Sequence, residues 1–484
     1  MAREVVSSHN LAATSSRGAR STPALTPGKP LTTTQTSADA ADIPPVGSVR
    51  KLARSGAIAG VIKLASAGLS LLMFFAVALV TDERQFGLYG AAYAGASLAS
   101  FFNTLGQQSA VLRFWPEYAS AGSYQTAHSF MARSLLLAAG GALISAVLVG
   151  AIGFIPWFHD DTPEWLPLCL ASAVLALAMG WSEVTSAAVR AKGTVVAGLI
   201  PRDIMWRVLV IAAAGIVWSV HGNLSAAVVV AASAVLLLVA VAPQSFEIVR
   251  TTVVAERVRL TAVQAAEFRS VTQGLWGINA VPPALAQLST LLIAGILGPE
   301  TAGAVFVAER ATRVVALALH GINQAFAPEV SGAYHRGDIR FVRRLAHLTS
   351  LSSGVVALLV FIVYLLFGKQ VLGLFEPSYA TDTFHATLLI FCAGTMISSS
   401  LGPVELLMQL TGGQHRLLRI LSIVQPIGLV MTGVLAFALG PVGAATAISG
   451  TLVAWVGLGA LSLDRHIDIN PTLFGILREM RTQQ

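Results

Sequence analysis

Long runs of apolar residues alternate along the chain with short polar breaks. About twelve of these runs reach the ~20 apolar residues that a membrane-spanning helix needs. Only helices and closed barrels can cross lipid, and the runs are too long and continuous for barrel strands. The pattern predicts helices over residues 55–80, 87–112, 130–155, 166–190, 200–220, 223–245, 273–298, 302–327, 346–368, 384–410, 415–438 and 441–463.

The composition supports this interpretation. Hydrophobic residues make up 55% of the 484 residues and charged residues only 11%, whereas soluble domains carry about 25% charged residues. So little charge cannot cover the surface of a soluble chain of this length. We therefore expect an all-α polytopic membrane protein whose first partner is the lipid bilayer.

Basic residues mark the orientation of the predicted spans. If the N-terminal tail is cytoplasmic, the outside loops carry only Arg84 and Lys369, and all other loop Arg and Lys residues lie inside. Such an asymmetry is typical of cytoplasmic loops. It predicts an even number of spans with both termini cytoplasmic. The net charge of +7 is scattered over these short loops, which argues against nucleic acid as a partner.

The segments outside the spans suggest five parts. Residues 1–50 are rich in Ser, Thr, Ala, Pro and Gly and predict a disordered cytoplasmic tail. We expect an N-terminal six-helix lobe over 51–246, a cytoplasmic linker over 247–272, a C-terminal six-helix lobe over 273–465 and a cytoplasmic tail over 466–484. In the linker, residues 253–268 alternate charged and apolar positions, which fits a helix on the membrane surface or a solvated helix equally well.

An internal repeat relates the two lobes. The segments that begin at residues 80 and 297 share several positions, and later positions continue the match with offsets between 212 and 220 residues. Six spans per repeat is an even number, so both halves enter from the same side, which predicts a parallel, pseudo-symmetric repeat with the substrate held between the lobes. The matched positions are Gly87 with Gly303, Gly106 with Gly321, Pro116-Glu117 with Pro328-Glu329, Gly193 with Gly413 and Gly222 with Gly440.

No catalytic or cofactor signature stands out in the sequence. The chain lacks a His-Glu-x-x-His pair, a Walker A loop and a Gly-x-Ser-x-Gly elbow, and its ten histidines are spread singly. Cys169 and Cys392 lie inside apolar runs, as small core residues do. We expect no enzyme activity, no catalytic residues, no metal site and no cofactor.

Charged residues inside the predicted spans are the candidate site residues, since a charge in hydrocarbon usually faces an aqueous cavity or a partner. Basic groups suit phosphate oxygens, whereas acidic groups suit a coupling cation or a cationic substrate. The substrate-binding candidates are Lys63, Arg113, Arg207, Arg310 and Arg313, and the ion-coupling candidates are Glu183, Glu309 and Glu405.

Other interpretations of these charges stay open. Asp203 with Arg207, and Glu309 with Arg313, are spaced four apart and could form ion pairs within one helix. Arg113 and Glu405 lie near inner helix ends, where long side chains reach the interface. Lys63 and Arg310 have no partner nearby in the sequence, which favours a cavity for these two.

Two adjacent prolines lie in the predicted helix over 273–298. Pro282 and Pro283 each remove a backbone donor, and proline kinks a helix. The pair predicts either a hinge for alternating access or a static packing kink.

Three segments resemble the bacterial polysaccharide-transport proteins, the oligosaccharide flippases of the multidrug/oligosaccharidyl-lipid/polysaccharide exporter superfamily. The resemblance covers about residues 50–465 and is most specific in the Gly-Pro-Glu-x-x-Gly start, the Pro-Glu end and the following Gly-Asp of the second segment. The segments are ERQFGLYGAAYAGASLASFFNTLGQQSAVLRFWPE (83–117), LLIAGILGPETAGAVFVAERATRVVALALHGINQAFAPEVSGAYHRGD (291–338) and LFEPSYATDTFHATLLIF (374–391).

This resemblance implies two six-helix lobes in a bacterial inner membrane. It implies a flippase that moves undecaprenyl-diphosphate-linked oligosaccharide to the outer leaflet for exopolysaccharide, capsule or O-antigen, with glycosyltransferases and a polymerase as partners. Two alternatives remain: a multidrug or cation exporter of the same superfamily, and a membrane enzyme such as a polysaccharide polymerase. An acid-lined cavity would favour drugs and a base-lined cavity a lipid diphosphate, while a polymerase needs a larger outer loop than this chain has.

Overall fold

The computed structural model describes residues 46–155, 164–221, 223–313, 330, 333–334, 337–411, 413–467 and 469–472. The chain divides into two compact units, Met1–Lys51 and Leu52–Gln484. In the first unit, the described residues are the helical residues 46–51. All contacts discussed below lie within the second unit.

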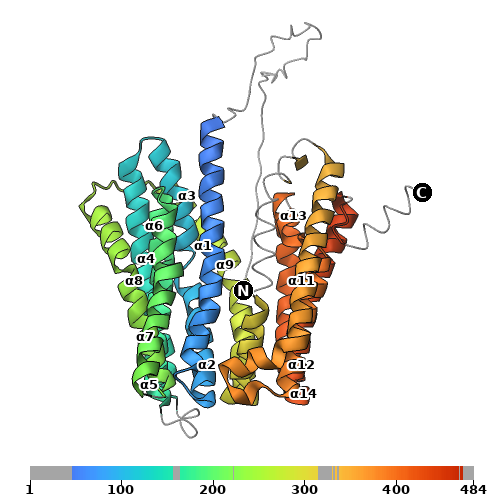
Figure 1. Ribbon diagram of the computed structural model, residues 1–484. Coiled ribbons are helices and arrows are strands. Elements are labelled where there is room, and N and C mark those ends of the chain that lie inside the picture. Colours follow the sequence, from blue (N-terminus) through green and yellow to red (C-terminus); the bar gives the residue numbers. More distant parts are fainter. Residues whose placement is uncertain are drawn as a thin grey trace, which may run out of the picture. The chain divides into compact units, whose positions relative to one another are not determined.

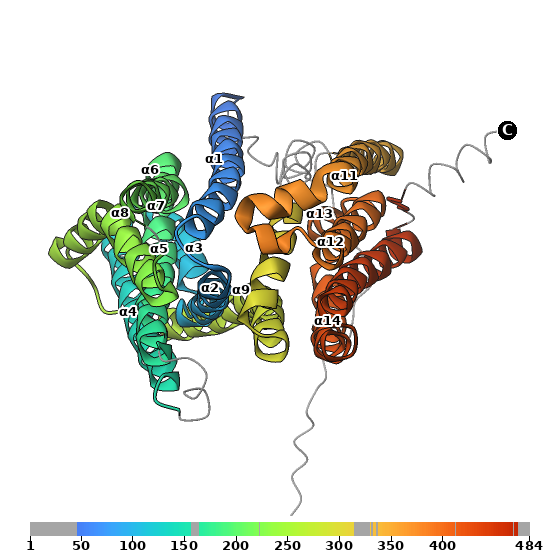
Figure 2. The same cartoon turned by 60° about the horizontal axis from the view of Figure 1, so that its bottom comes forward.

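The N-terminal half is a bundle built around α5 (Trp165–Ala191), which packs against α2, α3, α4, α6 and α8. Figures 1 and 2 both show α4, α5 and α8 side by side. Small buried residues such as Ala176, Ala187 and Ala188 allow this close packing of α5 with its neighbours. The other elements of this half are α1 (Val46–Ala78), α2 (Glu83–Asn103), α3 (Gln107–Ser120), α4 (Tyr124–Ile152), α6 (Val195–Ile200), a π-helical turn (Pro201–Met205), α7 (Trp206–His221) and α8 (Ala226–Val254).

In the C-terminal half, α12 (Asp382–Ser400) packs between α11 and α14 (Figure 2). Helix α9 (Ala262–Leu297) packs against α2 and α3 of the first half and against α14 of the second. This helix therefore joins the two halves through side-chain contacts as well as through the chain. The remaining elements are a helix over residues 299–313, α11 (Ile339–Phe375), a 3-10 turn (Pro377–Tyr379), α13 (Val404–Leu410) and α14 (Gln414–Ile467).

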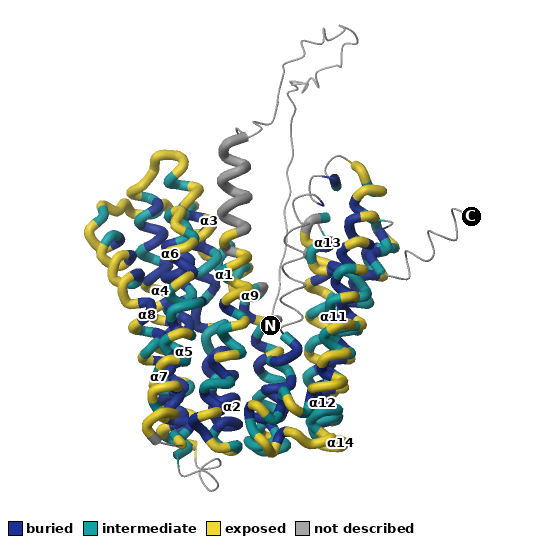
Figure 3. Tube along the Cα trace, viewed as in Figure 1, coloured by how far each residue is buried: buried dark blue, intermediate teal, exposed yellow. Residues whose placement is uncertain are grey.

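Nine of the described helices are long and apolar enough to cross a membrane. Helix α14 contains two of the predicted spans. They are separated at Gly440, which has a non-helical backbone (φ 64°) directly before Pro441. Helix α2 and residues 299–313 do not belong to the nine, although the sequence predicts a span over each. Exposed apolar side chains along α4 and α11 (Figure 3) face outward, as in lipid-facing helices. The chain is thus an all-α, multi-pass membrane protein.

Two predicted spans are interrupted in the structure. The span predicted over 87–112 breaks after α2, where Leu105 (φ 49°) and Gly106 (φ 73°) adopt the left-handed conformation before α3 begins. A Cβ on Gly106 would lie 2.8 Å from the backbone nitrogen of Trp276, so α9 packs directly on this break. Similarly, the span predicted over 384–410 divides into α12 and α13, with Gly402 at φ 99° between them.

The helix predicted over residues 253–268 is interrupted in the middle. Helix α8 continues to Val254, and residues 255–261 are non-helical. Thr261 then caps α9: its hydroxyl accepts from the backbone N–H of Gln264, whose side chain accepts from the backbone N–H of Thr261. Ser129 of α4 ties down the connection, since its hydroxyl donates to the Val258 carbonyl (2.8 Å) and accepts from the Val258 N–H (3.0 Å).

Helix α9 runs without interruption through Pro282 and Pro283. The hinge predicted at these prolines stays a prediction. Of the repeat positions, Gly193 (φ 91°) lies in the turn before α6, and Gly413 lies directly before α14. The repeat positions Gly222, Gly321, Pro328 and Glu329 lie outside the described residues.

Candidate functional site

A cavity of about 520 Å³ lies among α2, α3, α5, α7, α8, α9 and the helix over 299–313. Its described lining contains one carboxylate, Glu183, and five guanidinium groups. The arginines come from three separate parts of the chain, which the fold brings together. They are Arg190, Arg202, Arg207, Arg310 and Arg313.

Helix α2 gives this cavity a polar wall. Tyr93, Ser97, Ser100 and Thr104 line it, and their spacing of three to four residues places them on one helical face. This polar face explains why the mean hydropathy of α2 falls below that of the nine most apolar helices.

Asp203 anchors the basic groups of the first half. Its carboxylate is only 5% exposed and accepts from the Lys63 ammonium at 2.6 Å. Lys63 therefore has a partner that lies 140 residues away, although none is near it in the sequence. Because Lys63 is half-exposed and is not among the lining residues, its predicted role in the cavity stays a prediction.

Arg207 is held mainly by backbone and hydroxyl groups. Its Nη1 donates to the carbonyls of Asp203 (2.7 Å) and Arg202 (3.0 Å), and its Nε donates to the Ser70 hydroxyl (2.6 Å). The Asp203 carboxylate lies farther away, at 4.0 Å. The predicted ion pair within this helix is thus loose, and Asp203 binds Lys63 more closely.

Glu183 pairs with Arg202 across the cavity wall at 2.5 Å. Arg190 and Arg202 belong to the basic residues predicted to lie on the cytoplasmic side, and both line the cavity. Arg190 is held by its own helix, since its Nε donates to the Ser186 carbonyl at 3.4 Å. A signal for Arg202 was present in the sequence: it stands beside Asp203, inside an apolar run.

Arg310 is the lining arginine with the fewest polar partners in the described part of the chain. Its Nε and Nη2 are buried and have no hydrogen-bond partner there. Three aromatic rings surround the guanidinium, with centroids of Phe306 at 4.7 Å, Phe74 at 5.3 Å and Tyr93 at 5.8 Å. Such rings stabilise a cation without neutralising it, so Arg310 keeps its charge for another anion.

The neighbouring charges behave as the helical spacing indicates. Arg313 donates to Glu309 with its Nη2 at 2.6 Å and its Nε at 3.2 Å, in an ion pair within one helix. The five lining arginines therefore outnumber the three carboxylates that lie closest to them, which are Glu183, Asp203 and Glu309. The excess of positive charge suits an anionic ligand.

Two further predicted site residues, Arg113 and Glu405, do not line this cavity either. Arg113 is half-exposed on α3, pairs with Glu267 at 3.2 Å and Glu117 at 3.9 Å, and is not among the lining residues. Glu405 lines a different cavity of about 350 Å³ in the C-terminal half, where Glu309 and Arg313 also contribute. The basic and acidic candidates thus form more than one group.

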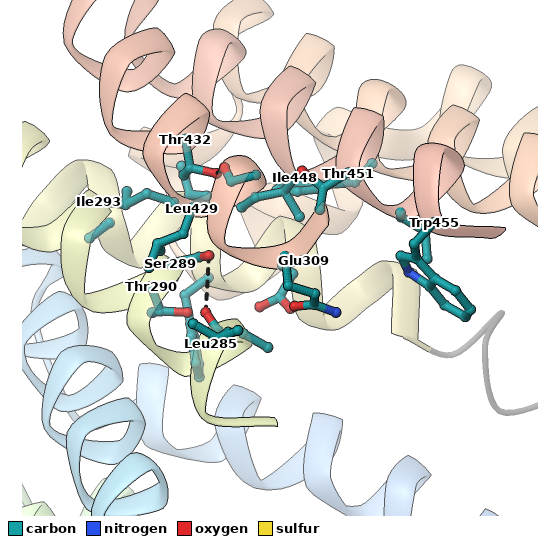
Figure 4. Close-up of a pocket in the computed structure, with 18 residues that line it drawn as sticks. Leu285, Ser289, Thr290, Ile293, Glu309, Leu429, Thr432, Ile448, Thr451 and Trp455 are labelled. Atoms are coloured by element: carbon teal, nitrogen blue, oxygen red, sulfur yellow. Dashed lines mark hydrogen bonds between the residues drawn. The ribbon is translucent and has the colours of Figure 1, made fainter. Parts of the chain in front are cut away.

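A third cavity, of about 220 Å³, lies between α9, the helix over 299–313 and α14 (Figure 4). Glu309 is the charged residue of its described lining, which also includes Ser289, Thr432 and Thr451. Figure 4 shows the Glu309 carboxylate among these hydroxyl side chains and apolar groups. Glu309 therefore contributes to two cavities of the C-terminal half.

Comparison with solved structures identifies the fold. The chain resembles an inward-facing multidrug resistance MATE family transporter of the MOP superfamily, with a TM-score of 0.65, 16% identity and coverage of 85% of this chain and 98% of that one. It also resembles an outward-facing MATE family transporter (TM-score 0.57, 17% identity, coverage 87% and 96%). A MOP superfamily transporter from Pyrococcus furiosus gives the same TM-score, identity and coverage as that second structure.

Comparison of the sequence with protein-family models finds no match, and comparison with curated proteins finds none either. At 16–17% identity the structural likeness establishes the fold. The chain has the fold of MOP superfamily transporters, which confirms the predicted architecture of about twelve helices in two six-helix lobes.

Proposed function

We propose that the chain is a transporter that moves an amphipathic anion with a phosphate-containing head group across the membrane by alternating access. The lipid-linked oligosaccharide predicted from the sequence, with its diphosphate between lipid and sugar, is the substrate we favour. One observation carries this proposal: five arginines and one carboxylate line the same cavity.

The state of Arg310 supports an anionic substrate in particular. A guanidinium in a low-dielectric cavity is costly unless an anion or fixed dipoles stabilise it. The rings of Phe74, Tyr93 and Phe306 supply part of that stabilisation. Two phosphate oxygens would supply the rest, since planar guanidinium groups bind them in pairs.

The fold is compatible with this substrate class. A Pyrococcus furiosus transporter with the same fold is described as having a binding pocket of reverse polarity, which suggests a different function for it. Pocket polarity thus varies among transporters of this fold. We therefore weigh the basic lining of this chain above the multidrug descriptions of its structural neighbours.

Export of cationic drugs is the second candidate function. Similar structures are described as multidrug resistance transporters, and the cavity of Figure 4 has Glu309 as its charged lining residue. A carboxylate among apolar and hydroxyl groups suits a lipophilic cation. This function would place the substrate in the C-terminal half, away from most of the arginines.

A deletion strain of the native organism separates the two functions. We expect lipid-linked sugar to accumulate on the cytoplasmic face, to be cleared by the wild-type protein and to persist with Arg310→Gln. Arg250→Gln, an exposed arginine of α8 outside the cavity, is the matched control and should clear it. Increased drug sensitivity without lipid-linked sugar, restored by the wild type but not by Glu309→Gln, would instead establish the second function.

A further inference from the structure

A large apolar groove lies beside the basic cavity. It has a volume of about 970 Å³ and is formed by α2, α4, α5 and α9. Its described lining holds no charged side chain. Small residues such as Gly95 on α2 and Gly295 on α9 create the space, because no atom lies within 4 Å of a Cβ on Gly295 and only Leu291 does so for Gly95, at 3.8 Å.

The groove and the basic cavity use different faces of α2. Leu88, Ala92, Gly95 and Ala99 face the groove, whereas the polar face that begins at Tyr93 lines the cavity. Both sets repeat every three to four residues, as the two sides of one helix do. Helix α2 therefore has an apolar site on one side and a basic site on the other.

Along α2 and α9 the two sites overlap in depth, because the groove-lining residues run from Leu88 to Asn103 and from Trp276 to Gly295, and the cavity-lining residues run from Tyr93 to Thr104 and from Asn279 to Gln287. They differ in depth along α5. Along α5, the groove includes Trp165 to Ser172, and the cavity includes Met179 to Arg190. Along α4, the groove extends from Gly141 to Ile152, which is about 16 Å at 1.5 Å per residue, or about half of a 30 Å hydrocarbon core. The groove thus extends farther than the cavity toward the predicted outer side of the membrane, and the cavity extends farther than the groove toward the predicted inner side along α5.

The groove is open to lipid on its α4 side. Ile144 and Leu148 line it and are 63% and 64% exposed. Such exposed apolar side chains on a membrane-spanning helix contact hydrocarbon chains. A chain can therefore enter sideways without crossing the polar lining of the cavity.

The two sites approach one another at a short stretch of α9. Trp276 lines the groove and donates to the Phe102 carbonyl at 3.0 Å, while Asn279 lines the cavity and donates to the Ser109 hydroxyl at 3.0 Å. One helical turn of α9 therefore separates an apolar environment from a basic one. A molecule that uses both sites must have an apolar part and an anionic part joined near this level.

We propose that the groove holds the hydrocarbon chain of the amphiphile whose phosphate occupies the basic cavity. The inference rests on the proposed function and adds a chain-length requirement to it. Because the groove extends from Trp276 to Ile152 and Trp165 at the predicted outer end, only a long chain can fill it along its length while the phosphate lies in the cavity. A long polyprenyl chain meets this requirement, and a short one does not.

The test compares two diphosphates with chains of different length, undecaprenyl diphosphate and farnesyl diphosphate, binding to the purified full-length protein in nanodiscs. The wild type should bind the long chain at least about tenfold more tightly, since only that chain packs against the walls along the whole groove. Gly95→Phe and Gly295→Phe, which fill the groove from opposite sides, should reduce this ratio to near one and leave farnesyl diphosphate binding unchanged.

Val147→Phe is the control for an added ring, because Val147 is 64% exposed on α4 and does not line the groove. Equal binding of both diphosphates by the wild type, lost in Arg310→Gln, would contradict the role proposed for the groove and would support the phosphate site. A long-chain preference that both groove variants retain would also contradict that role. Binding of neither diphosphate would overturn the proposed function itself.

Discussion

Gly87 of α2 and Gly303 of the helix over 299–313 lie against each other, so that a Cβ added to Gly303 would be 3.2 Å from the Cα of Gly87. These are the first two matched positions of the internal repeat. Equivalent residues of two related halves can touch only near the pseudo-symmetry axis, so the axis passes between them. Both lie at the predicted outer side, where the backbones of the two halves approach each other closely.

This contact predicts that Gly87→Ala disfavours the present conformation. The added methyl group would overlap the Pro299 carbonyl, and forcing a methyl group into a packed contact costs about 1–3 kcal/mol. We expect the outer ends to separate. Distances between spin labels at the exposed residues Arg84 and Ser378 should increase, as measured by double electron–electron resonance.

Gly140→Ala is the control for that experiment, since no atom lies within 4 Å of a Cβ at Gly140. It should leave the distance distribution unchanged. An unchanged distribution in Gly87→Ala as well would show that the glycine contact does not hold the outer ends together.

The ring cluster around Arg310 predicts an effect of an uncharged substitution on anion binding. Phe74→Leu keeps an apolar side chain but removes one ring beneath the guanidinium. A cation–π contact contributes about 0.5–2 kcal/mol, so undecaprenyl diphosphate should bind about 2- to 30-fold more weakly. Phe86→Leu, a buried ring that contacts Phe306 and not Arg310, should change the affinity less. Equal losses in both variants would indicate a general packing effect.

The Lys63–Asp203 pair predicts a non-additive effect on thermal stability. Asp203→Asn leaves Lys63 and Arg207 without the buried carboxylate, which we expect to cost about 1–3 kcal/mol. Lys63→Met should cost less, since the half-exposed ammonium contributes through a partly solvent-screened contact. The loss of stability in the double variant should therefore be smaller than the sum of the losses in the two single variants. Midpoint temperatures of unfolding in detergent measure these losses. Strict additivity would mean that the pair adds nothing to stability.

Glu376 predicts a pH dependence outside the membrane-spanning segments. Burial raises the pKa of its carboxyl group above 4.5, and Glu83 and Asp82 act in the same direction. The folded state therefore favours the protonated form. The stability that this proton contributes is complete below the pKa of the unfolded chain and is lost as the pH rises through the raised pKa.

The midpoint temperature of unfolding should consequently decrease as the pH rises from 4.5 toward neutral. Glu376→Gln should make this decrease smaller. Glu247→Gln changes a carboxylate of α8 outside this group and should keep the wild-type pH dependence. If Glu376→Gln keeps it too, other groups determine the slope.

Sequence patterns predict helix existence well and helix interruptions poorly in this chain. The boundary at Gly440-Pro441 was predictable, because proline cannot donate a helical hydrogen bond and glycine adopts a positive φ at little cost. The break at Leu105 was not, since leucine rarely adopts a positive φ. Packing of α9 on Gly106 determines that break, and such a contact between distant segments leaves no local pattern.

The candidate site was predictable by residue type but not by partner. Charges inside apolar runs pointed to Arg207, Arg310 and Arg313, and all three line one cavity. The sequence predicted ion pairs only between residues of the same helix, such as Glu309 and Arg313. Lys63 finds its partner on a distant helix, and sequence spacing carries no information about such a pair.

The π-helical turn over Pro201–Met205 determines which side chains of α7 face the cavity. Its closing bond runs from the Trp206 N–H to the Pro201 carbonyl, one residue farther along the chain than in an α-helix. The turn thus holds one extra residue, and its removal would restore a regular helix while rotating α7 by roughly 100° about its axis. Trp206 and Arg207 would then turn away from the buried Ser233 carbonyl and from Ser70. The length of this segment, as much as its composition, determines whether a positive charge faces the cavity or the lipid.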